Sequence, residues 1–133
     1  MIKKTVFTLI LLMGFTSIIY CQTYTQLDIE NKFINKWTLK SVEVNNKATP
    51  LNAKQKNAYS IFAKDSTYTN ISDNGHETGR WYFDYKKQVL ILNDGKGDNP
   101  DMKMKIERLT DKECVLLLPE ANNCAAKIFL VRN

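Results

Sequence analysis

From residue 36 onwards the chain consists of short runs in which apolar and polar residues alternate, separated by turn-forming residues at intervals of about 8–12 positions. Alternation with a period of two predicts β-strands, and the turns are too short for a helical crossover. Consecutive strands are therefore expected to be antiparallel. We expect eight strands at about residues 36–44, 58–63, 67–73, 78–85, 88–93, 102–110, 113–118 and 125–132.

Eight consecutive antiparallel strands close most simply into a barrel, because closure removes the exposed sheet edges. The predicted fold class is therefore all-β, with an eight-stranded antiparallel up-and-down barrel over about residues 36–132. A sandwich of two sheets is the structural alternative, because it is built from similar short strands.

A short helix is expected before the first strand, at about residues 26–35. Thr25 followed three residues later by Asp28 fits a capping box at a helix start. Apolar residues then recur at helical spacing, at Leu27, Ile29, Phe33 and Ile34. Three of the expected strands, 88–93, 113–118 and 125–132, are apolar on both faces. We expect the helix to cover part of their outer faces.

Residues 1–21 have the features of a secretory signal peptide, with Lys3 and Lys4 before a long apolar run. Cleavage after Cys21 would leave one domain, residues 22–133, without an integral membrane span, in the periplasm or outside the cell. Two alternatives remain open. The segment could be retained as an anchor, or Cys21 could carry a lipid, although Tyr20 is large for the position before a lipidated cysteine.

The formal net charge of +5 is mild, and the lysines are spread along the chain without a cluster between aromatic residues. Nucleic acid is therefore not an expected partner, and we expect a monomer.

Cys114 and Cys124 could form a disulfide in an exported domain. A tight hairpin would place Cys114 opposite Phe129 and Cys124 opposite Pro119, about 16 Å apart along the strands. That distance exceeds what a disulfide can span. A wider loop or a shifted register would bring the two cysteines together, so the pairing stays open.

Catalytic and metal-binding groups are scarce. His76 is the only histidine, and no cysteine or carboxylate cluster has the spacing of a transition-metal site. The acidic loop at residues 93–101 does not match an EF-hand. No nucleophile is paired with a base. We therefore expect no enzyme activity, no cofactor and no metal.

The inward face of the barrel is expected to be apolar. It would be formed by Phe62, Tyr68, Trp81, Phe83, Met102, Met104, Ile106, Leu116 and Leu130. An eight-stranded barrel is just wide enough either to be filled by its own side chains or to hold one small ligand. The first functional hypothesis is a non-enzymatic binder of a small apolar or amphipathic molecule. The alternative is a filled barrel that binds a protein through its loops at residues 45–53 and 94–101.

Several short motifs together resemble a known family. They are Trp37-Thr38-Leu39 in the first strand, Phe62 and Tyr68 around a turn, Gly79-Arg80-Trp81, Val89-Leu90-Ile91-Leu92, and Phe129-Leu130-Val131-Arg132 at the end. The chain resembles the lipocalin-like or calycin barrels, and more closely the small exported bacterial lipocalin-like domain proteins. The resemblance implies that Trp37 lies at the closed end of the barrel with the Arg132 guanidinium across its ring. Asn35 stands where the family has a glycine.

Overall fold

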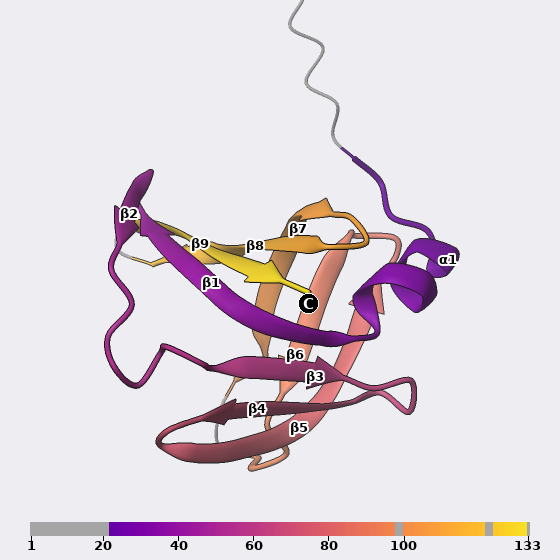
Figure 1. The fold of residues 1–133 in the computed structure, drawn as a ribbon. Helices are drawn as coiled ribbons and strands as arrows, with labels where there is room; N and C mark the ends of the chain where they lie inside the picture. The colour runs from indigo at the N-terminus through magenta and orange to yellow at the C-terminus, as the bar shows by residue number, and fades with distance from the viewer. Residues whose placement is uncertain (1–21, 98–99, 122–123, 133) are drawn as a thin grey trace, which may run out of the picture.

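The computed structural model describes residues 22–97, 100–121 and 124–132 and is an all-β barrel with one short helical segment at its N-terminal side (Figure 1). The predicted signal peptide, residues 1–21, lies outside the described residues. The strands have the following bounds: β1 Lys36–Val44, β2 Lys47–Thr49, β3 Tyr59–Phe62, β4 Thr67–Ser72, β5 Gly75–Asp84, β6 Val89–Asn93, β7 Met102–Leu109, β8 Glu113–Ala121 and β9 Cys124–Val131.

The barrel is closed by pairing between the first and last strands. All strands except β2 follow one another around the barrel in chain order and are antiparallel to their neighbours. β1 then pairs with β9 from Thr38 opposite Val131 to Val44 opposite Ala126. The predicted eight-stranded up-and-down barrel is confirmed, and the sandwich alternative is wrong.

β2 is the strand that the sequence did not predict. It folds back on the end of β1, in a segment expected to be a polar loop. Asn45 and Asn46 form the turn with φ values of 52° and 64°. A two-residue hairpin turn requires positive φ at both positions, and asparagine tolerates it better than other non-glycine residues. The Asn-Asn pair was therefore a hairpin signal.

The helical segment closes one end of the barrel. It consists of α1 (Gln26–Asp28) and a wider turn, η1 (Ile29–Phe33), and starts with the predicted capping box between Thr25 and Asp28. Ile29 and Phe33 are fully buried in the barrel core. The helix therefore inserts its apolar face into the barrel end, and the expectation that it covers an outer strand face is wrong.

Aromatic rings fill the barrel beneath the helix. The ring centroid of Phe33 lies 4.4 Å from that of Phe62 and 5.3 Å from that of Trp81. Trp81 also donates its indole N–H to the carbonyl of Ala63, in the turn between β3 and β4. We call this helix-side part of the barrel the closed half. Its core contains Tyr24, Ile29, Phe33, Trp37, Phe62, Trp81, Phe83, Leu90, Ile106, Leu109, Cys114 and Leu116.

Gly79 is predicted to be intolerant of any side chain. It lies opposite Tyr68 in the β4–β5 pair, and a Cβ added to it would overlap the carbonyl oxygen of Asn93 and lie 2.6 Å from the Tyr68 ring. We expect Gly79→Ala to lower the free energy of unfolding by about 1–3 kcal/mol, because backbone and ring must both move. Urea denaturation measures this loss, and Thr78→Ala, at the exposed neighbouring position, is the control. Equal stability of the two variants would contradict the close packing at Gly79.

Candidate functional site

The end of the barrel away from the helix is packed differently from the closed half. Its inward-facing positions are partly rather than fully buried, and some carry polar side chains. We call this part the open half and define it by Leu39, Ser60, Asn70, Leu92 and Ile128. Leu39, Leu92 and Ile128 pack against the edge of the core, so the open half begins where the aromatic packing ends.

One pocket of the open half lies where β1 separates from β3. The two strands pair only from Lys36 to Thr38 of β1, after which β1 bends away to pair with β2 and β9. The separation leaves a pocket of about 210 Å³. It is lined by Leu39, Ala58, Tyr59, Ser60, Asn70, Ile71, Ser72, Ile128 and Leu130.

A second pocket, of about 270 Å³, lies at the mouth of the barrel, between β4, β5 and the segment before β7. It is lined by Tyr68, Asn70, Glu77, Leu92, Asp94, Pro100 and Met102. Asn70 lines both pockets, so they lie on either side of this residue or next to it.

Polar groups run across the open half on neighbouring strands. Ser60 lies opposite Asn70, and Asn70 opposite Glu77. The Ser60 hydroxyl donates to the Asn70 side-chain oxygen at 2.6 Å. Because this bond uses the amide oxygen, the Asn70 amino group is the part of that side chain that can donate to a ligand.

The hydroxyl of Tyr68 is a second donor. Burial raises the pKa of Tyr68, and the nearby carboxylates of Glu77 and Asp94 raise it further. The hydroxyl therefore stays protonated at neutral pH and can donate a hydrogen bond. The same two carboxylates make the mouth unfavourable for an anionic group.

Most of the predicted inward-facing residues are in the core. Phe62, Tyr68, Trp81, Phe83, Met104, Ile106, Leu116 and Leu130 are all buried. Met102 is the exception, because its side chain is 51% exposed. It shares the inward face with Met104, but it is the first residue of β7 and lies at the rim of the mouth. Strand alternation correctly predicted that Met102 faces inward. It could not predict that the barrel ends at Met102.

The predicted stacking of Arg132 on Trp37 is wrong. The Trp37 indole is fully buried and donates its N–H to the carbonyl of Phe33 at 2.9 Å. Arg132 donates to the carbonyl of Asp111 at 3.2 Å. In the described residues the cation–π contact found is that of Lys36 with Tyr59. Trp37 therefore holds the helix to the barrel, and backbone pairing joins the first strand to the last.

Cys114 is a free, fully buried thiol, so the disulfide that the sequence permitted is absent. It lies opposite Leu130 in β9, not opposite Phe129, and Leu130 is six residues from Cys124. Six residues of strand span about 20 Å, which no disulfide bridges. Burial raises the pKa of Cys114 to about 12, which keeps the thiol protonated and unreactive.

His76 is exposed near the start of β5, at the rim of the barrel. Among the described side chains no group of three or more histidine, cysteine, aspartate or glutamate residues could hold a metal ion. No helix within the described ranges is long and apolar enough to span a membrane.

The polar residues of the open half were not among the inward-facing residues that we predicted from the sequence. Ser60 and Asn70 occupy the same inward faces as the predicted Phe62 and Tyr68, two residues away on each strand. Strand alternation alone would have placed them inside. The prediction assumed an apolar inner face, whereas Ser60 and Asn70 are polar.

Comparison with known proteins adds no assignment: no family model, curated protein or solved structure matches the chain. The closed eight-stranded barrel is compatible with a calycin-like fold.

Proposed function

We propose that this protein is a non-enzymatic carrier or sensor that binds one small amphipathic molecule in the open half of its barrel. The observation that carries the proposal is the pair of pockets that share Asn70 as a lining residue, above a core that is filled with aromatic rings. The motifs that resemble lipocalin-like proteins support the same reading. Residues 1–21 support export, so the ligand would be met outside the cytoplasm.

The pocket volumes limit the size of the ligand. Ligand sites commonly measure about 300–1,000 Å³, and each pocket of the open half is smaller than that range. Because the closed half is full, a ligand cannot extend beneath Leu39 and Leu92 without displacing core side chains. The ligand is therefore small or has a narrow apolar part.

The lining also indicates which groups the ligand would contact. Leu39, Leu92 and Ile128 offer apolar surface, while the Asn70 amide and the Tyr68 hydroxyl offer donors. The apolar part of the ligand would lie against the leucines and Ile128, and any hydrogen-bond acceptor on the part that reaches Asn70 would bind to its amide N–H groups.

A pair of neighbouring substitutions tests the location of the site. Ser60 faces the open half, and Ile61, the next residue of β3, faces outward and is 37% exposed. Ser60→Phe adds a ring inside the pocket, and Ile61→Phe adds one outside. With the uncharged fluorescent probe N-phenyl-1-naphthylamine, we expect Ser60→Phe to weaken binding at least tenfold and Ile61→Phe to change it less than twofold.

Thermal unfolding of both variants confirms that they are folded before binding is compared. Equal binding by the two variants would place the probe elsewhere on the surface. Failure of the unmodified protein to bind the probe, together with a bare mass for protein isolated from its own cells, would exclude the proposal and favour a filled barrel.

A further inference from the structure

The barrel wall has an opening between β7 and β8. Pairing between these strands in the described residues begins at Lys105 opposite Leu117. Beyond that point β7 pairs only with β6, through Met104 and Met102, and β8 pairs only with β9. Pro119 gives a physical reason, because proline has no backbone N–H to donate to a ladder.

A pocket of about 290 Å³ lies at this opening. Its lining combines two inward-facing residues, Met104 and Leu118, with outward-facing residues of three strands. The outward-facing residues are Val89, Lys103, Lys105 and Leu117, and Pro119 completes the lining. The pocket therefore reaches from the outer surface to side chains of the interior.

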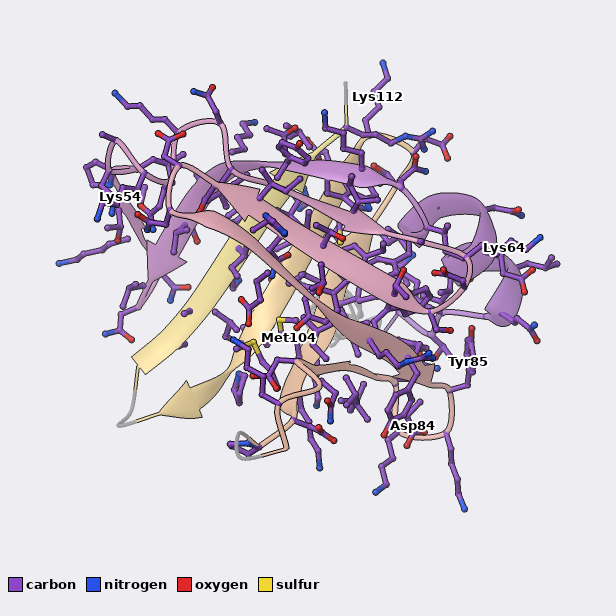
Figure 2. All side chains as sticks on the ribbon, turned by 90° about the horizontal axis from the view of Figure 1, so that it is seen from below. Lys54, Lys64, Asp84, Tyr85, Met104 and Lys112 are labelled. Carbon is purple, nitrogen blue, oxygen red and sulfur yellow. The ribbon has the colours of Figure 1, made fainter. Side chains whose placement is uncertain are left out.

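Met104 is the buried residue of this pocket's lining. Its side chain is buried in the middle of the barrel, among the strands (Figure 2). Met102 is the next inward-facing residue along β7, and it lines the mouth pocket. Methionine is unbranched and flexible, so it can change rotamer to admit an alkyl chain at low energetic cost.

The charge of the described side chains that line the opening is positive. Lys103 and Lys105 are exposed on the outer face of β7 and form no ion pair with the described side chains. Lys127 differs, because its ammonium group is 3.0 Å from the Glu107 carboxylate. The mouth of the barrel carries the opposite charge, from Glu77 and Asp94. An anionic head group is thus favoured at the wall and disfavoured at the mouth.

We propose that the ligand of the open half is a free single-chain anionic amphiphile, whose head group is held by Lys103 and Lys105 and whose chain enters between β7 and β8 past Met104. This inference rests on the proposed function and adds the ligand class and the entrance. Exposed ion pairs contribute little to affinity, so most of the affinity comes from burial of the chain, and the lysines select the charge of the head group.

Methyl-methionine NMR with dodecanoate as the probe tests the inference. Met102 and Met104 are the methionines of the described residues, and they report on the mouth and on the wall opening respectively. We expect dodecanoate, below its micelle concentration, to shift the Met104 methyl signal most. We expect the cationic analogue dodecyltrimethylammonium to bind at least tenfold more weakly.

Charge reversal supplies the matched control. The double variant Lys103→Glu/Lys105→Glu is expected to weaken dodecanoate binding at least tenfold and to improve binding of the cationic analogue. Lys54→Glu/Lys64→Glu changes the net charge equally at positions far from Met104, and it is expected to change both affinities less than twofold (Figure 2). If the reversed pair destabilises the barrel, Lys103→Gln/Lys105→Gln removes the positive charge without adding a negative one.

The outcomes separate this inference from the proposed function. A dodecanoate shift at Met102 alone, or an affinity indifferent to the reversal at Lys103 and Lys105, would overturn the wall entrance and leave the proposed function in place. No shift at either methionine, with no probe bound in the open half, would overturn both. Binding to anionic phospholipid vesicles without any response to monomeric dodecanoate would also overturn the inference.

Discussion

Replacing Trp37 with alanine is expected to lower the free energy of unfolding by about 3–5 kcal/mol, measured by urea denaturation. The side chain is fully buried beneath the helical segment, so its removal leaves a large cavity. The loss is a large share of the 5–15 kcal/mol that typically separates the folded and unfolded states.

Trp37→Phe separates packing from hydrogen bonding. It retains an aromatic ring and loses the indole N–H that donates to the Phe33 carbonyl. We expect a smaller loss of about 1–3 kcal/mol, because a buried carbonyl is left without that donor. Tyr82→Ala, at a 53% exposed position, is the control and should change stability by less than about 0.5 kcal/mol. A Trp37→Ala variant no less stable than this control would contradict the structural role of Trp37.

Replacing Phe33 with alanine is expected to cost about 3–5 kcal/mol as well and to loosen the helical segment. Phe33 is the last residue of η1 and contacts both Phe62 and Trp81 across the barrel end. Its loss removes the contacts that keep water from these rings. The tryptophan fluorescence of the folded variant should therefore shift to longer wavelength.

Leu27→Ala is the matched control on the same helical segment, because Leu27 is 67% exposed. We expect this variant to keep the fluorescence and nearly all of the stability of the unmodified protein. Equal effects of Phe33→Ala and Leu27→Ala would contradict the insertion of the helical segment into the barrel.

The barrel and most of its inner face could be predicted because strand alternation and turn spacing are local features of the sequence. Met104 and Ile106 followed from alternation with lysine and glutamate along β7. The position of a residue along the barrel axis depends on the whole fold and cannot be predicted from its neighbours in the sequence. Met102 was therefore expected in the core, although it lies at the rim, and the helix was assigned to the wrong surface.

The interactions of Trp37 and Arg132 show a second limit. Their stacking was expected from a family resemblance, and each side chain instead donates to a backbone carbonyl, that of Phe33 for Trp37 and that of Asp111 for Arg132. Likewise, the opening beside Met104 depends on where two ladders stop. In the sequence, Pro119 indicates that strand pairing is interrupted near residue 119. Only the register of β7 and β8 shows which residues of β7 are left unpaired.

Native mass spectrometry of the protein purified gently from the cells that make it tests most directly whether the barrel is a container. We expect a mass above that of the polypeptide, with the excess lost on denaturation and equal to one small amphipathic molecule. The denatured mass of the same sample should also correspond to a chain that begins at Gln22. A bare polypeptide mass in the native spectrum would contradict the central proposal, and the open half would then be an empty rim above a filled core.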